Sequence, residues 1–197
     1  MELGDEIARL RVTIEWCKKF NITHAMVNKM YKLAWALKEN GDKVAAYNKI
    51  NETINIADGV AHDIPPDWLN FAAHIALVYG DLVLALHYFE RIIDPMRRKP
   101  HTKPDIGVML NIVICHLARS RFSIAHEIVN RYMNDYIDPH LTTYFKQMRD
   151  LIDAVEERDI ETCEVILELF DFTWSTFDLN DRLFYDIKKT LLREVAE

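Results

Sequence analysis

Residues 80–92, which read GDLVLALHYFERI, contain the pattern that decides the fold. Ala85 is the small residue at its centre, and large apolar residues lie three positions before it and four and seven positions after it: Leu82, Phe89 and Ile92. These offsets place the four side chains on one face of an α-helix. A small residue on that face lets a neighbouring helix approach closely, while the larger side chains fill the grooves beside it.

The same pattern recurs along the chain. The small residues that anchor the four copies are 39, 40 and 38 positions apart: Ala46, Ala85, Ala125 and Cys163. At the same offsets the third copy has Phe122, Val129 and Tyr132, and the fourth has Ile160, Leu167 and Phe170. The first copy is weaker, with Lys43, Ile50 and Thr53. A period of about forty residues is typical of helical repeat proteins.

A polar pair lies four to five positions before each small residue: Gly41-Asp42, Gly80-Asp81, Ser120-Arg121 and Arg158-Asp159. Glycine can end a helix in the left-handed conformation, and aspartate can cap the helix that follows. Another helical run precedes each pair, over residues 32–40, 68–79, 106–119 and 142–157. The dipeptide Asp138-Pro139 resembles a cap followed by proline at the first helical position. Each repeat is therefore predicted to be a helix, a tight turn and a second helix.

We therefore expect an all-α fold, a TPR-like right-handed solenoid of antiparallel helix hairpins with a C-terminal helical cap. Two further helices, over about residues 5–20 and 178–195, would cover the ends, and no segment alternates convincingly enough to predict a strand. Residues 1–197 are predicted to form a single domain of ordinary size. Within it, stacked hairpins run to about residue 137 and a helical bundle occupies about residues 138–197.

Composition excludes several classes of protein. The chain has 197 residues, 50% of them hydrophobic, and only 5 glycines and 6 prolines, which excludes intrinsic disorder and collagen-like repeats. A net charge of −7 disfavours binding of nucleic acid by the molecule as a whole. No apolar stretch reaches the length of a membrane-spanning helix, and three widely spaced cysteines favour a reducing compartment. We expect a cytoplasmic protein.

The sequence contains no recognisable catalytic motif. It has no phosphate-binding glycine loop, nucleophile elbow or zinc-protease pattern, and its eight histidines show no metal-ligand spacing. Cys115 and His116 are adjacent in an apolar helix, so their side chains diverge, and a buried structural thiol is predicted at Cys115. His74, His116 and His126 are interpreted as residues of the core edge or the surface. We expect no enzyme activity, no catalytic residues, no cofactor and no metal site.

Acidic residues are concentrated near the C-terminus. Between residues 150 and 171 the only base is Arg158, and there are nine acids: Asp150, Asp153, Glu156, Glu157, Asp159, Glu161, Glu164, Glu168 and Asp171. The charges themselves leave two interpretations open. They are either a solvated helix face or a docking surface for a basic partner.

From about residue 72 onward the chain resembles the C-terminal half of the α-type soluble NSF attachment proteins (SNAP family). The resembling segments include residues 73–88, Cys115-His116 with the following Ser120, residues 151–157 (LIDAVEE) and residues 187–191 (IKKTL). The family's signatures at the last two read roughly LLEAHEE and IKKTI. Members are helical-hairpin adaptors that link SNARE bundles to the AAA+ ATPase called NSF.

The resemblance implies a function and a set of binding residues. The family's acidic pocket for the ATPase corresponds to Asp153, Glu156 and Glu157. Its near-terminal leucine, which stimulates the ATPase, has Leu192 or Val195 as a substitute here, in a less acidic tail. The basic positions that hold the SNARE bundle correspond to Lys146 and Arg149. Three other positions that are basic in the family are Asn70, Ile106 and Thr143 here.

On this basis the chain is expected to be an adaptor in vesicle fusion. It would bind a SNARE complex and an NSF-type AAA+ ATPase, and it would associate peripherally with membranes through the SNAREs. Two alternatives remain: a general TPR-like scaffold that binds another helix or peptide, and a shortened competitor of the full-length adaptor.

Overall fold

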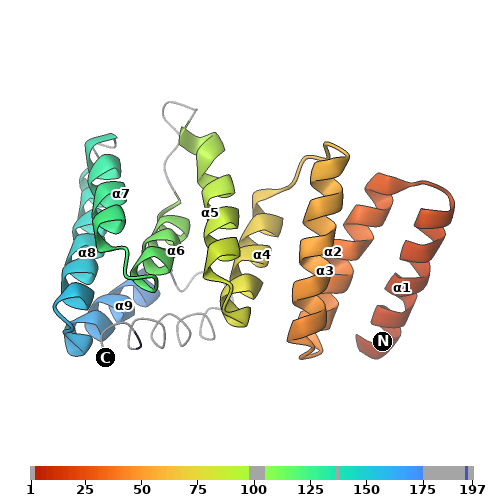
Figure 1. Cartoon of the computed structure of the whole chain (residues 1–197), viewed down its shortest axis with the longest axis horizontal. Helices are drawn as coiled ribbons and strands as arrows, with labels where there is room; N and C mark the ends of the chain where they lie inside the picture. The colour runs from red at the N-terminus through yellow and green to blue at the C-terminus, as the bar shows by residue number, and fades with distance from the viewer. Residues whose placement is uncertain (1–2, 98–104, 136–137, 175–193, 195–197) are drawn as a thin grey trace. The chain divides into compact units, whose positions relative to one another are not determined.

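The computed structural model describes residues 3–97, 105–135, 138–174 and 194, and all regular secondary structure among them is α-helical (Figure 1). The helices are α1 (Leu3–Lys19), α2 (Thr23–Glu39), α3 (Lys43–Gly59), α4 (Pro66–Tyr79), α5 (Leu82–Arg97), α6 (Ile106–Leu117), α7 (Phe122–Asp135), α8 (Pro139–Glu156) and α9 (Ile160–Trp174). Neighbouring helices pack against each other from α1 through α4 and from α5 through α9, which confirms the predicted all-α hairpin solenoid. Apart from Glu194, the predicted helix over residues 178–195 lies outside the described residues.

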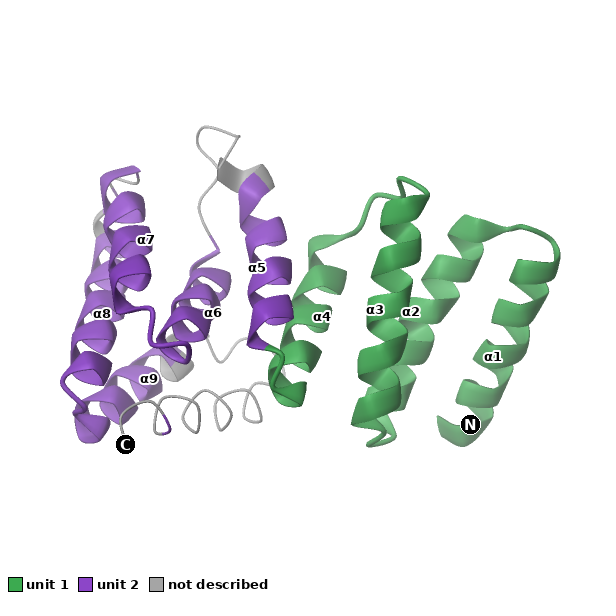
Figure 2. Cartoon of the chain, in the orientation of Figure 1, with its two compact units in different colours: residues 1–81 green, residues 82–197 purple. Residues whose placement is uncertain are grey.

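The chain divides into two compact units, residues 1–81 with α1 to α4 and residues 82–197 with α5 to α9 (Figure 2). The boundary falls at the turn of the second predicted hairpin, between Asp81 and Leu82. In the first unit α2 packs between α1 and α3, and α4 packs on α3. In the second unit α6 contacts α5, α7 and α8, and α9 packs on α8. The predicted single domain, with a change near residue 137, stays a prediction.

The predicted turns share one backbone conformation. The first residue of each polar pair has a positive φ, with values of 81° at Gly41, 83° at Gly80, 52° at Ser120 and 62° at Arg158. The next residue donates its backbone N–H to a carbonyl five positions earlier, as Asp81 N does to Ala76 O at 2.9 Å. This hydrogen bond satisfies a carbonyl that the helix end leaves open. The copies of the repeat therefore share the conformation of the helix end as well as the core residues.

Two further turns have the same geometry, although the sequence has no polar pair of the repeat at these positions. Asn21, between α1 and α2, has a φ of 55°, and Ala61, between α3 and α4, has a φ of 49°. Ile22 N and His62 N then donate to carbonyls five positions earlier, at 2.9 Å in both cases. Every described hairpin turn thus ends its first helix in the same way.

Aspartates begin several of the helices. The side chains of Asp42, Asp105, Asp138 and Asp159 each accept a hydrogen bond from a backbone N–H in the first turn that follows, at 2.9 to 3.1 Å. Such a cap satisfies one of the four N–H groups that lack a partner at a helix start. Pro139 is at the start of α8, directly after Asp138, which confirms the predicted cap and proline pair.

The anchors of the repeat lie in the core. Ala46, Ala85, Ala125 and Cys163 are all buried, and so are the residues four and seven positions after each of them. Thr53 of the weak first copy is also buried, because its hydroxyl donates to Lys49 O at 2.6 Å within α3. The positions three residues before the anchors are half-buried, except for the exposed Lys43. The pattern therefore predicted burial correctly at the anchors and at the positions four and seven residues after them, but not fully at the positions three residues before them.

Candidate functional site

Helix α8 carries the predicted docking residues on the face opposite to its core contacts. One face of α8 packs into the second unit through Leu141, Phe145, Met148, Leu151, Ile152, Ala154 and Val155, all of which are buried. Lys146, Arg149, Asp153, Glu156 and Glu157 are all exposed. Their spacing of three and four residues places them in one stripe along the helix. The structure therefore brings the five residues together on a single exposed surface, which we call the α8 stripe.

The charge of the α8 stripe changes sign along the helix. Lys146 and Arg149 lie in its middle, and Asp153, Glu156 and Glu157 occupy its C-terminal end. Seven residues separate Lys146 from Asp153, which corresponds to about 10 Å along a helix axis. The expected SNARE-binding and ATPase-docking residues therefore share one face and lie within about three helical turns of each other.

A histidine of the preceding helix contacts the acidic end of the stripe. His126 on α7 has its Nε2 atom 3.4 Å from Asp153 Oδ1 and 3.7 Å from Glu156 Oε2. The two carboxylates remain about half exposed, at 55% each, and the His126 side chain is 28% exposed. No lysine or arginine of the described residues pairs with Asp153, Glu156 or Glu157. The three carboxylates are therefore available to a basic partner.

The position of these carboxylates is unfavourable for the helix itself. Asp153 and Glu156 lie in the last turn of α8, and Glu157 is its C-cap residue. The carbonyl end of a helix carries a partial negative charge. Each carboxylate there therefore destabilises the helix by roughly 0.3–1 kcal/mol, whereas a base would stabilise it by a similar amount. Stability by itself would favour lysine or arginine at these positions. The three carboxylates therefore do not serve the stability of this helix end.

The turn after α8 holds this end of the helix in place. Arg158 adopts the left-handed conformation, and Asp159 N donates to Ala154 O at 2.8 Å. The Asp159 carboxylate then accepts hydrogen bonds from Thr162 N at 3.0 Å and from Thr162 Oγ1 at 2.6 Å. The Thr162 hydroxyl, followed by the backbone N–H groups, lowers the pKa of Asp159. Asp159 is thus a cap of α9, with its own partners, and we do not count it among the docking residues.

The other positions implied by the resemblance are not part of the α8 stripe. Leu192 and Val195, expected to act on the ATPase, lie outside the described residues. Of the three positions where the family has bases, Thr143 is exposed, Asn70 is half-buried and Ile106 is 2% exposed. Ile106 begins α6 and contributes to the core, so this position offers no side chain to a partner.

His116 corrects one sequence-based expectation. It is buried, at 4% exposure, instead of lying at the core edge or surface. Neither ring nitrogen has a hydrogen-bond partner among the residues that the structure describes. Burial, with the nearby Arg121 and Arg119 as lesser causes, lowers its pKa and keeps the imidazole neutral. His74 and His126 are half-buried, as expected.

All three cysteines are buried thiols. Cys17, Cys115 and Cys163 are free and buried, which confirms the interpretation of Cys115 as a buried thiol. Burial, assisted by the Asp159 carboxylate, raises the pKa of Cys163 to about 11. In the described part of the chain no three histidine, cysteine or acidic side chains are grouped as metal ligands. None of the described helices is both long and apolar enough to span a membrane.

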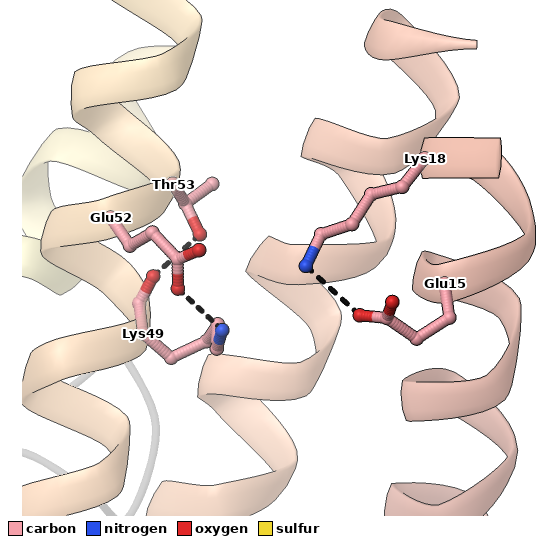
Figure 3. A network of polar contacts seen from close by, with 5 residues as sticks. All are labelled: Glu15, Lys18, Lys49, Glu52 and Thr53. Atoms are coloured by element: carbon pink, nitrogen blue, oxygen red, sulfur yellow. Dashed lines mark hydrogen bonds and ion pairs between the residues drawn. The ribbon is translucent and has the colours of Figure 1, made fainter. Parts of the chain in front are cut away.

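A groove in the first unit was missed by the sequence analysis. It has a volume of about 580 Å³ and an apolar floor of Ile14, Leu33 and Leu37. Charged pairs line its two sides: Lys18 with Glu15 on α1, at 2.9 Å, and Lys49 with Glu52 on α3, at 2.5 Å (Figure 3). Glu15 raises the pKa of Lys18 through their hydrogen bond. No repeat or motif marked this groove, because it forms only where three helices meet.

Comparison with known proteins supports the fold class alone. The chain matches no family model, and no curated protein matches it. Among solved structures it is similar to BtubC (BKLC) from P. vanneervenii, with 14% sequence identity and a TM-score of 0.51. The alignment covers 100% of this chain and 85% of the BtubC chain. The site and fold thus define a helical-hairpin repeat protein with a charged stripe on α8.

Proposed function

We propose that this protein is an adaptor in vesicle fusion that binds a SNARE complex and recruits an NSF-type AAA+ ATPase to disassemble it. The observation that carries the proposal is the set of three exposed carboxylates at the end of α8, without a lysine or arginine partner among the described residues. The resemblance of residues 151–157 to the ATPase-docking signature of the SNAP family supports the same surface.

The proposed docking contact is electrostatic. Asp153, Glu156 and Glu157 would form ion pairs with a basic surface of the ATPase. Exposed ion pairs contribute about 0–1 kcal/mol each, so several must act together for useful affinity. Binding should therefore weaken as salt approaches 1 M, where the Debye length is about 3 Å. The protein would work in the cytoplasm and reach membranes only through the SNAREs.

The SNARE contact is proposed for Lys146 and Arg149. Both are exposed, and a SNARE bundle with an acidic surface would pair with them. Because these bases and the carboxylates share the α8 stripe, the two partners would approach neighbouring parts of one face. Charge reversal of Lys146 and Arg149 should therefore reduce SNARE binding and leave ATPase binding in place.

The central test is the triple variant D153K/E156K/E157K, assayed for binding of the purified ATPase with and without SNARE complex. We expect binding to be lost. The matched control is E39K/D58K/D63K, which reverses three exposed acids of the first unit and changes the net charge equally. Retained binding in the triple variant, or equal loss in the control, would refute the docking assignment.

A single change outside the carboxylates sharpens this test. His126→Lys places a permanent positive charge beside Asp153 and Glu156 without altering either. We expect it to weaken ATPase binding several-fold, whereas His126→Gln should bind like the wild type. Equal affinities for the two variants would indicate that the carboxylates do not contact the ATPase.

The groove of the first unit supports a second candidate function, a scaffold that binds another helix or peptide. Its apolar floor and charged sides suit a short amphipathic segment. Affinity purification from cytosolic extract, followed by mass spectrometry, distinguishes the two. Recovery of SNAREs and the ATPase favours the adaptor, and an unrelated partner that is lost on Glu52→Lys, a change at the exposed side of the groove, favours the scaffold. A shortened competitor would bind SNAREs yet slow their disassembly by the full-length adaptor.

A further inference from the structure

The outer face of α1 carries large apolar side chains that no described residue covers. Val12, Trp16 and Phe20 recur every four residues and are 71%, 53% and 54% exposed. The rings of Trp16 and Phe20 contact each other, with centroids 4.7 Å apart. The opposite face of α1 packs into the first unit through Ile7, Leu10, Ile14 and Cys17. The helix is therefore apolar on both sides, which is unusual for a helix that borders solvent.

The charges on this outer face change sign along the helix. Asp5 lies in the first turn and Lys19 in the last, and both are exposed on the same side as Val12. Neither Asp5 nor Lys19 forms an ion pair with another described residue. Seven residues separate each of them from Val12, so the charges are placed symmetrically about it.

This symmetry fits a second copy of the same helix in the antiparallel direction. With a twofold axis at Val12, Lys19 of one copy comes level with Asp5 of the other, twice in the dimer. The two Val12 side chains then meet on the axis. An interface that repeats each contact in this way is typical of twofold dimers.

Side-chain size is complementary as well as charge. In the same arrangement Trp16 comes level with the exposed Ala8 of the second copy, whose short side chain leaves room for the indole ring. Arg9 of the second copy lies on the side of Trp16, where a guanidinium can stack on the indole ring. A large residue thus meets a small one, and a base meets an aromatic face.

We propose that the outer face of α1 is a homodimer interface in which two α1 helices pack antiparallel about Val12. A contact through one helix pair is small, so the dimer should be weak and depend on protein concentration. This inference does not rest on the proposed function, because it concerns a different unit and a different surface.

Sedimentation measurements across a range of protein concentrations test the interface. The wild type should rise from its monomer mass of 23.2 kDa toward twice that value. Asp5→Lys and Lys19→Glu should each weaken association about tenfold, because each places two like-charged pairs in the dimer. Mixing the two variants should restore association, since the mixed dimer pairs opposite charges on both sides. Circular dichroism confirms that both variants remain folded.

Cysteine cross-linking tests the direction of the helices. Val12→Cys places two thiols on the twofold axis, within reach of a disulfide. Ala8→Cys places them about 12 Å apart along the axis, too far for one. We expect oxidation to cross-link the Val12 variant and neither the Ala8 variant nor Val83→Cys, a control of 61% exposure on α5. A monomer at every concentration, no rescue on mixing, or equal cross-linking at positions 8 and 12 would overturn the proposal.

Discussion

At the scale of single residues, His116 shows how burial sets a property that its neighbours in sequence do not reveal. It belongs to α6, in which every residue except Gly107 is buried. The helix contacts α5, α7 and α8, so it has no face toward solvent broad enough for an imidazole. The sequence shows that His116 lies in an apolar helix, but it does not show that neighbouring helices cover every side of that helix.

The lowered pKa of His116 predicts a specific dependence of stability on pH. Its folded-state pKa lies below the ordinary value of 6.5, so the unfolded chain binds the proton more readily. The contribution of neutral His116 to the free energy of unfolding is fully present above pH 6.5, and it falls as the pH drops from 6.5 toward the lowered pKa. His116→Leu should remove this part of the slope. Urea unfolding of both proteins at about pH 8 and about pH 5 checks it, and parallel slopes would contradict it.

At the scale of helices, the end of α8 and the start of α9 place similar acids in opposite fields. Glu157 is the C-cap residue of α8, where the helix dipole repels a carboxylate. Glu161 lies in the first turn of α9, where the dipole attracts one. Both side chains are exposed. The sequence placed both acids near a predicted turn and could not decide their electrostatic effect without the helix limits.

This contrast predicts opposite effects of one substitution at neighbouring sites. Glu157→Lys should stabilise the fold by about 0.3–1 kcal/mol, and Glu161→Lys should destabilise it by a similar amount. Thermal unfolding at low salt measures both, and high salt should reduce the difference. If Glu157→Lys also weakens ATPase binding, this residue has a binding role that costs stability. Destabilisation by both variants would show that other contacts outweigh the dipoles.

The turns were the most predictable feature at this scale. The residue type at the left-handed position varies, being glycine at Gly41 and Gly80 but serine at Ser120 and arginine at Arg158. The spacing from the core anchors nevertheless located all four, because the same hydrogen bond closes each first helix. The turns at Asn21 and Ala61 were missed. No small anchor residue lies five positions after either of them, as one does after the other four.

For the whole molecule, the division into two compact units raises the question of whether both units unfold in one cooperative transition. Ile54 and Phe145 are both fully buried, the first in residues 1–81 and the second in residues 82–197. Truncation to alanine should cost about 2–5 kcal/mol at Ile54 and about 3–5 kcal/mol at Phe145. In a single cooperative domain, as the sequence predicts, both variants lower one common unfolding transition. Calorimetry measures this, and a shift confined to one of two separate transitions would show independent units.

The sequence by itself determined which residues share a helix face and where the hairpins turn, because both follow from local periodicity and backbone hydrogen bonds. The fold class and most of the core near the anchors could therefore be predicted, as could the acidic surface near residue 155. Only the tertiary structure decided how many faces of each helix are covered. That number depends on neighbours distant in sequence, and it buries His116, sets His126 beside Asp153 and leaves Trp16 open to solvent.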